Sequence, residues 1–328
     1  MKNHIGIGVS LCVLVTLLAT LFPSHAQKAA DHSPQAETGN GTPPLSNPLK
    51  VAMLKWYRAN LTTRFQVGSQ PYGVAFDGAN IWAANFGDGT VTKLQANDGT
   101  ILGTFKTGVS PYGVTFDGAN VWVSDVTTGT VTKLRASDGA NLGTFTVGAN
   151  PGWMAFDGEN IWVPYGTNTV AKLRARDGKN LGTFSLPSAA IAAAFDGSNV
   201  WLTNGPNTVT KLRTRDGKNL GNFTVGRAPL GVAFDGANIW VANDGDDTVT
   251  KLRASDGLVL GTFFSPNGPY GVVFDGRDIW VSGDSFVIEL RGDGSEVARW
   301  PITPSTGIAF DGANIWVAEG NKNDLDKL

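Results

Sequence analysis

The sequence predicts an all-β protein, a seven-bladed β-propeller with four antiparallel strands in each blade. The tripeptide Phe-Asp-Gly occurs seven times at spacings of 36 to 40 residues. A period near 40 that holds several short strands is typical of propeller blades. A tryptophan follows every tripeptide at a constant interval, and the incomplete last repeat is matched by a segment at the other end of the chain. The tripeptides begin at Phe76, Phe116, Phe156, Phe195, Phe234, Phe274 and Phe310.

The unit from Tyr72 to Thr107 shows how one repeat forms one blade. Four short segments with β-branched and aromatic residues lie at 72–76, 81–84, 90–94 and 101–107. Such segments favour strands, and the Gly-containing stretches between them favour tight turns. The order therefore predicts four antiparallel strands joined in sequence.

The tryptophans recur at one position of the second strand, and we interpret them as core. Each ring buries about 150–250 Å² when it fills the space between two sheets. They are Trp82, Trp122, Trp162, Trp201, Trp240, Trp280 and Trp316. A lysine recurs on the third strand as Lys93, Lys133, Lys172, Lys211, Lys251 and Lys327, and Glu289 takes its place in the sixth unit.

The last repeat ends after its third strand, because Leu328 follows Trp316 at the same interval that separates Leu94 from Trp82. The segment 61–68 resembles a fourth strand, since it matches Leu142–Gly148 in pattern. We expect segment 61–68 to pair with the final repeat and close the ring, which would cover an exposed sheet edge. The propeller is thus predicted to span residues 61–328.

The N-terminal 60 residues have a different character. Residues 1–26 read as a signal peptide with an apolar run and small residues before a cleavage site after Ala26, and an uncleaved membrane anchor is the alternative. Residues 27–60 are predicted to be a flexible linker with a possible short helix after Pro48. The single cysteine, Cys12, lies within the signal peptide, so no disulfide is expected in the mature chain.

The variable loops lie at one face of the predicted ring, where the second strand joins the third and where each blade joins the next. Functional sites are more often found on variable loops than on uniform turns. Tyr72, Tyr112, Trp153 and Tyr270 begin the innermost strands and are predicted to form an aromatic rim, with Arg227 nearby. Such a rim could stack on a sugar, a peptide or a flat organic ligand, or could simply plug the channel. Neighbouring loops add Tyr165, Asp125, Asp244, Asp284 and Glu319 as candidate ligand-binding residues.

The composition excludes several classes of site. The three histidines, at positions 4, 25 and 32, and Cys12 all precede the propeller. Residues 61–328 therefore offer no Ser-His-Asp relay, thiol nucleophile or histidine-based zinc site. The net charge of −2 argues against nucleic-acid binding. The acidic loop 243–247 could hold a calcium ion, but short acidic loops are usually only solvated, and we assign no metal, cofactor or catalytic residue.

The repeats resemble those of YVTN-type (YncE-like) bacterial β-propellers. The resemblance rests on Val147–Pro151, on Val225–Pro229 and on Phe234-Asp-Gly-Ala-Asn-Ile-Trp-Val-Ala-Asn243. The pattern is also similar to streptogramin (virginiamycin B) lyase and, more distantly, to lactonase-type propellers. In the lyase a histidine and a glutamate near a magnesium ion carry the elimination, and this propeller has no histidine to match.

Two functions remain open at this point, beside a third, an extracellular structural or adhesive role with which the near-uniform repeats are compatible. The first is a secreted or periplasmic, monomeric and non-catalytic propeller that binds a protein, glycan or small molecule at its variable face. The alternative is an envelope enzyme, similar to streptogramin lyase or to the lactonase-type propellers, that uses carboxylates and a divalent metal. The missing histidines favour the first. No membrane span is expected after the signal is removed.

Overall fold

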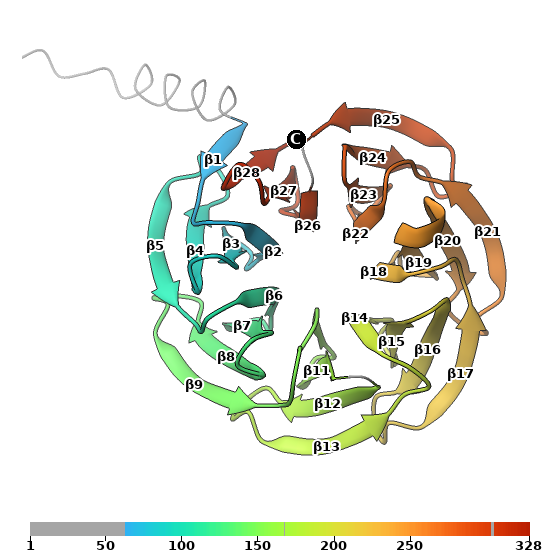
Figure 1. The fold of residues 1–328 in the computed structure, drawn as a ribbon, viewed down its shortest axis with the longest axis horizontal. Helices are drawn as coiled ribbons and strands as arrows, with labels where there is room; N and C mark the ends of the chain where they lie inside the picture. The colour runs from blue at the N-terminus through green and yellow to red at the C-terminus, as the bar shows by residue number, and fades with distance from the viewer. Residues whose placement is uncertain (1–62, 167, 303–304) are drawn as a thin grey trace, which may run out of the picture. The chain divides into compact units, whose positions relative to one another are not determined.

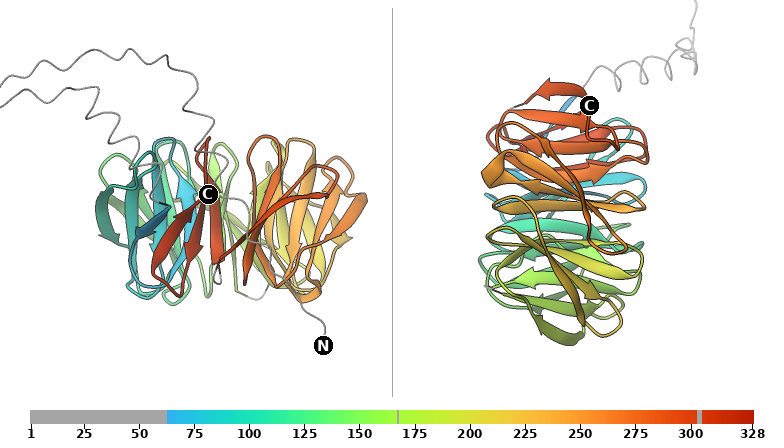
Figure 2. Two further views of the ribbon diagram at one scale, coloured as in Figure 1. Left: turned by 90° about the horizontal axis from the view of Figure 1, so that it is seen from above. Right: turned by 90° about the vertical axis from the view of Figure 1, so that its right-hand side faces the viewer.

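The computed structural model describes residues 63–166, 168–302 and 305–328, so the predicted signal peptide and linker lie outside the described residues. Seven four-stranded antiparallel sheets surround a central channel (Figure 1). Figure 2 shows their strands running between the two faces of the ring. The predicted fold class is confirmed. In the described part of the chain, no helix has the length and apolar composition needed to cross a bilayer.

Each blade has an innermost strand at the channel and an outermost strand at the rim. The innermost strands of blades 1 to 7 are β2 (Pro71–Phe76), β6 (Pro111–Phe116), β10 (Ala155–Phe156), β14 (Ala190–Phe195), β18 (Pro229–Phe234), β22 (Pro269–Phe274) and β26 (Ser305–Phe310). The second strands are β3 (Asn80–Asn85), β7 (Asn120–Asp125), β11 (Asn160–Tyr165), β15 (Asn199–Asn204), β19 (Asn238–Asn243), β23 (Ile279–Gly283) and β27 (Ile315–Glu319).

The third strands are β4 (Thr90–Gln95), β8 (Thr130–Arg135), β12 (Thr169–Arg174), β16 (Thr208–Arg213), β20 (Thr248–Arg253), β24 (Phe286–Leu290) and β28 (Asp324–Lys327). The outermost strands are β5 (Ile101–Lys106), β9 (Asn141–Thr146), β13 (Asn180–Ser185), β17 (Asn219–Thr224), β21 (Val259–Phe264), β25 (Glu296–Pro301) and β1 (Arg64–Gln66). One 3₁₀ turn, η1 (Asp244–Asp246), follows β19.

Blade 7 combines strands from both ends of the described chain. β1 pairs antiparallel with β28, and Phe65 lies opposite Leu325. Phe65 and Leu325 are both buried, and the Phe65 ring packs 5.1 Å from the ring of Trp316. The backbone N–H of Lys327 also donates to the carbonyl of Thr63. The outermost strand of this blade is therefore held by ladder hydrogen bonds and by a buried aromatic contact.

The seven tryptophans are core, as the repeat pattern predicted. Each indole N–H donates to the aspartate of the preceding turn, and the recurrent lysine lies over six of the rings. In blade 2 the Trp122 indole N–H donates to Asp117 Oδ2 at 2.7 Å, and Lys133 Nζ lies 5.2 Å from the Trp122 ring centroid. The same lysine donates to the carbonyls of Ala175 and Arg176 in the next blade at 2.7 and 3.2 Å. The recurrent lysine thus joins six of the tryptophans to the adjacent sheet, a role that the repeat pattern alone did not reveal.

Glycine allows the innermost strands to pack backbone against backbone. A Cβ at Gly113 would lie 2.8 Å from the carbonyl oxygen of Gly152 and 3.0 Å from Ser124 Oγ. Ser124 Oγ accepts from the Gly113 N–H at 2.9 Å and donates to the Gly152 carbonyl at 3.0 Å. This close approach brings the residues that begin neighbouring innermost strands into contact at the mouth of the channel.

Candidate functional site

Four aromatic rings meet at the mouth of the central channel, and we call Tyr72, Tyr112, Trp153 and Tyr270 the aromatic cluster. The centroid of Tyr112 lies 5.2 Å from that of Tyr72 and 4.7 Å from that of Trp153. Tyr270 approaches Trp153 edge to face at 5.4 Å, and its hydroxyl lies 3.2 Å from the hydroxyl of Tyr112. The rings therefore touch one another across the channel instead of standing apart as an open rim.

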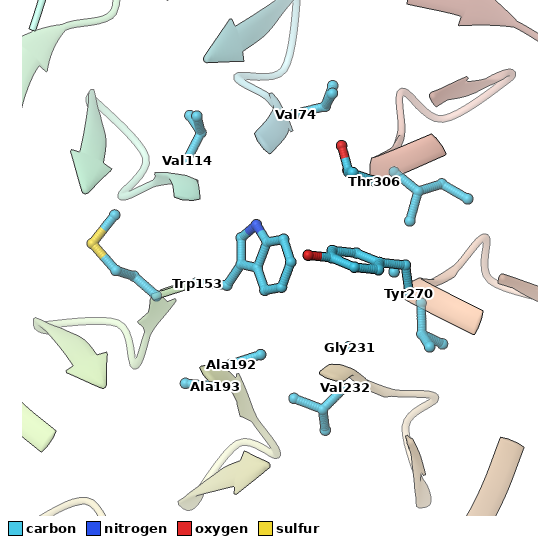
Figure 3. A pocket seen from close by; sticks show the side chains of 14 residues that line it. Val74, Val114, Trp153, Ala192, Ala193, Gly231, Val232, Tyr270 and Thr306 are labelled. Carbon is cyan, nitrogen blue, oxygen red and sulfur yellow. The ribbon is translucent and has the colours of Figure 1, made fainter. Parts of the chain in front are cut away.

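Trp153 reaches the centre because its backbone leaves its own blade. Its N–H donates to the carbonyl of Ile191, and its carbonyl accepts from the N–H of Ala193 in blade 4. The first strand of blade 3 is consequently shortened to Ala155–Phe156. This irregularity places the indole opposite Tyr270, which comes from blade 6 (Figure 3).

A cavity of about 180 Å³ adjoins Trp153 and Tyr270 within the channel. Figure 3 shows the two rings facing each other, with Val74, Val114 and Thr306 around them. Each blade contributes one apolar side chain to the wall: Val74, Val114, Met154, Ala193, Val232, Val272 and Ile308. A protein cavity of roughly 150 Å³ with an apolar lining can hold benzene. The space is thus large enough for one aromatic ring.

The hydroxyl groups of Tyr112 and Tyr270 are neutral. Burial raises the pKa of the Tyr112 hydroxyl, and the neighbouring Tyr270 raises it further. Burial also raises the pKa of Tyr270, against the hydrogen bond from Tyr112, and nearby Tyr72, Asp244 and Asp284 add to the increase. The hydroxyls can act as donors and acceptors, but they do not supply a base at neutral pH.

A negatively charged region lies beside Tyr270 on the loops of blades 5 and 6. A Cβ at Gly268 would lie 2.8 Å from Asp244 Oδ1 and 3.2 Å from Asp284 Oδ2, so both carboxylates approach this loop. Asp247 Oδ1 accepts from the Gly268 N–H at 2.8 Å. Partial burial raises the pKa of Asp244, and the charges of Asp284 and Asp247 raise it further. This side of the cluster therefore disfavours an anionic ligand.

Arg227 is held by its own loop. Its Nε donates to Asp246 Oδ1 at 2.6 Å, and its terminal nitrogen donates to the carbonyl of Gly245 at 2.7 Å. The side chain is 73% exposed. Arg227 therefore braces η1, and its charge is offset by Asp246.

Three other candidates lie apart from the aromatic cluster. Asp125 is buried and accepts hydrogen bonds from the N–H groups of Val109, Ser110 and Thr128, so its carboxylate organises the loops of blade 2. Tyr165 packs against the core that contains Trp122. Glu319 is fully buried where β1 closes blade 7. Binding by these residues stays a prediction, and the structure does not bring them to the channel mouth.

The channel wall was missed by sequence reasoning, although a signal for it was present. The wall residues occupy one position of each repeat, two residues before the phenylalanine of Phe-Asp-Gly, and all seven are apolar. Comparing that column across the repeats would have indicated an apolar channel.

No protein-family model matches the chain, and no curated protein matches it in sequence. Among solved structures, the chain is similar to a streptogramin B lyase, with a TM-score of 0.70 and 18% identity over 80% of this chain and 95% of that chain. It is also similar to a Kuenenia stuttgartiensis hydrazine synthase, with a TM-score of 0.71 and 16% identity over 80% of this chain and 96% of that chain. Both similarities show the propeller fold.

Proposed function

We propose that this protein is a non-catalytic propeller that binds a small ring-containing ligand, neutral or positively charged, in the central channel. The observation that carries the proposal is the cavity beside Trp153 and Tyr270, to which each blade contributes one apolar side chain. An aromatic ligand gains from contact with the ring of Trp153 and from the removal of its surface from water. The carboxylates of Asp244 and Asp284 near Tyr270 add a preference for positive charge.

A matched series of single-ring compounds tests the proposal. Benzylamine, benzyl alcohol and benzoate differ mainly in charge, and ligand-observed NMR detects weak binding of each. We expect binding of benzylamine and benzyl alcohol, and weaker binding of benzoate because the neighbouring carboxylates repel it. Equal binding of all three compounds would refute the proposed preference for neutral or positively charged ligands. Binding of none would refute the proposal that the cavity binds a ring.

A pair of variants locates the binding. Ala193→Phe places a ring in the cavity and should abolish binding of benzyl alcohol. Ala313→Phe adds the same ring to an exposed turn and should leave binding unchanged. Circular dichroism checks that both variants fold. Binding that survives Ala193→Phe in folded protein would place the site elsewhere.

Export of the protein is part of the same proposal. The apolar run and the small residues before Ala26 support a signal peptide, which would deliver a monomeric propeller to the periplasm or the exterior. The repeats also support a relationship to the YVTN-type propellers. Mass spectrometry of the N-terminus after expression in a bacterial host tests the export step, and an intact Met1 on an envelope-bound protein would favour the anchor.

One observation favours the enzyme alternative, namely the raised pKa of Asp244, which lies beside Asp284 and the aromatic cluster. A carboxyl group with a raised pKa can act as a general acid or base. A lactone ring-opening assay with magnesium tests this alternative on the wild type and on Asp244→Asn. Turnover by the wild type that Asp244→Asn abolishes would replace the binding proposal with a catalytic one.

A further inference from the structure

Blade 7 differs from the other blades in the side chains that connect its second and third strands. In blade 1, Asn85 Nδ2 donates to the hydroxyls of Thr90 and Thr92 at 3.0 and 2.8 Å. Blade 5 repeats this neutral arrangement from Asn243. The pairing of β27 with β28 places Glu319 opposite Asp324, just as Asn85 lies opposite Thr90. Three acidic residues thus take the positions of one asparagine and two threonines.

These acidic residues, Glu319, Asp324 and Asp326, form what we call the closure cluster. Their exposed fractions are 0%, 4% and 6%, and one oxygen from each lies within 4.8 Å of the others. Buried carboxylates are costly unless a cation or hydrogen-bond donors compensate their charge. The cluster therefore requires compensation that the neutral triads of blades 1 and 5 do not.

The protein's own cations compensate two of the three charges. Arg64 Nε lies 2.9 Å from Asp326 Oδ1, and Lys322 Nζ lies 2.7 Å from Glu319 Oε2. Both approach from the solvent side, because their side chains are 54% and 30% exposed. One negative charge remains in the cluster.

Asp324 lacks a cationic partner among the described residues. No N–H or O–H donor reaches its buried Oδ1, and Gln66 Nε2 is 3.5 Å from its Oδ2. An oxygen atom in the interior of the cluster is therefore buried without a hydrogen-bond donor.

We propose that Glu319, Asp324 and Asp326 bind a calcium ion that fastens β28 into blade 7. Calcium takes oxygen ligands at about 2.3–2.6 Å, so two oxygens bound to one ion lie at most about 5 Å apart, and the three oxygens of the closure cluster meet this limit because they lie within 4.8 Å of one another. Magnesium demands octahedral geometry and keeps several waters, which suits a buried cluster less well. Because Asp326 also pairs with Arg64 of β1, the ion would strengthen the contact between the two ends of the ring.

Thermal unfolding of the full-length protein tests the site, with calcium chloride, magnesium chloride, zinc chloride or a chelator. A ligand at about 100 times its Kd stabilises a protein of this size by roughly 5–10 °C in Tm. We expect a shift of this order with calcium and a smaller one with magnesium. Titration calorimetry should show one calcium ion per chain.

Two variants separate the closure cluster from other acidic groups. The triple substitution Glu319→Asn, Asp324→Thr and Asp326→Thr restores the triad of blade 1, so it should fold and lose the calcium shift. The double substitution Asp244→Asn and Asp284→Asn neutralises a different acidic region and should retain the shift. Should the triple variant not fold, Asp324→Asn keeps the shape of the side chain and should weaken calcium binding by about tenfold or more.

Three results would overturn the proposal. An unchanged Tm of the wild type with calcium at pH 7 would mean that a proton, and not a metal, compensates the third charge. A shift with zinc alone would exclude calcium. A calcium shift retained by the folded triple variant, or undiminished affinity in Asp324→Asn, would place the ion elsewhere.

Discussion

Replacing Lys133 by methionine removes an ammonium group and keeps most of the apolar stem over Trp122. In the wild type, Lys133 Nζ donates to the carbonyls of Ala175 and Arg176, and it lies 5.2 Å from the centroid of the Trp122 ring. The lysine is 6% exposed, so these contacts are shielded from water. Its removal also leaves the buried carbonyl of Ala175 without its lysine donor.

The magnitude follows from opposing contributions to the free energy of unfolding. A hydrogen bond to a charged group contributes about 1.5–3 kcal/mol, and a cation–π contact contributes about 0.5–2 kcal/mol. Desolvation of the ammonium offsets a large part of this sum. We expect a net loss of about 1–3 kcal/mol, which lowers the Tm by roughly 3–10 °C in a domain of this size.

Calorimetric melting of Lys133→Met measures this loss. Lys106→Met is the matched control, because Lys106 is exposed on the outermost strand of blade 1 and should change the Tm little. A Tm of Lys133→Met equal to or above that of the wild type would refute the reasoning, since the lysine would then cost as much in desolvation as its contacts return.

Three further predictions concern the backbone, the acid response and the ring closure. Gly113→Ala brings a Cβ within 2.8 Å of the Gly152 carbonyl and should lower the free energy of unfolding in urea by about 1–3 kcal/mol. Gly292→Ala is the control, because its Cβ would meet nothing within 4 Å, and it should leave stability unchanged. Equal effects of the two substitutions would contradict the packing argument. The pKa of Asp235 is lowered because hydrogen bonds from Trp240, Asn238 and the backbone outweigh its burial. The ionised carboxylate of Asp235 contributes to folding stability above about pH 3.9, and this contribution is lost as the pH falls through its folded pKa. Asp235→Asn should therefore flatten the decline of Tm below about pH 4. An unchanged decline would exclude this carboxylate as a cause. Deletion of residues 61–68 removes the partner of β28 and should give a lower Tm and aggregation by light scattering, and unchanged melting with a monomeric state would show that β1 is dispensable.

The architecture was predictable because its determinants repeat. Phe-Asp-Gly marks the end of every innermost strand, and the tryptophan six residues later marks the second strand. Seven copies of the same local pattern average out the ambiguity of any one copy. The match between segment 61–68 and the fourth strands indicated the partner of β28, and the observed strand within it is Arg64–Gln66.

Contacts between blades could not be predicted in the same way. The recurrent lysine of the third strands was visible in the sequence, but its contact with the carbonyls of the next blade depends on the offset between neighbouring sheets. Glu289 stood out as an exception without a reason. The structure supplies one: in blade 7 the third and fourth strands come from opposite ends of the chain, so the turn that the other lysines bind is interrupted there.

The candidate site was predicted only in part. Tyr72, Tyr112, Trp153 and Tyr270 do gather at the channel, because the three tyrosines occupy equivalent positions of their innermost strands and Trp153 lies one position further along its repeat, just before β10. Their mutual contacts depend on the departure of Trp153 from blade 3, which no repeat pattern encodes. Glu319 was assigned to the loop face, but the pairing of β27 with β28 buries it among two other acids that the sequence analysis did not single out.

The neighbouring positions of Thr63 and Lys327 make the order of the blades along the chain adjustable. In blade 1, the five residues 96–100 join the third strand to the fourth. A linker of similar length between the two ends would give blade 7 an uninterrupted turn, and new termini could then be opened at an Asp-Gly turn of another blade. In such a circular permutant, the blade with the new termini would have the interrupted turn between its third and fourth strands. The recurrent lysine of the blade before it would then lose the turn carbonyls that it binds, whereas position 289 could accept a lysine.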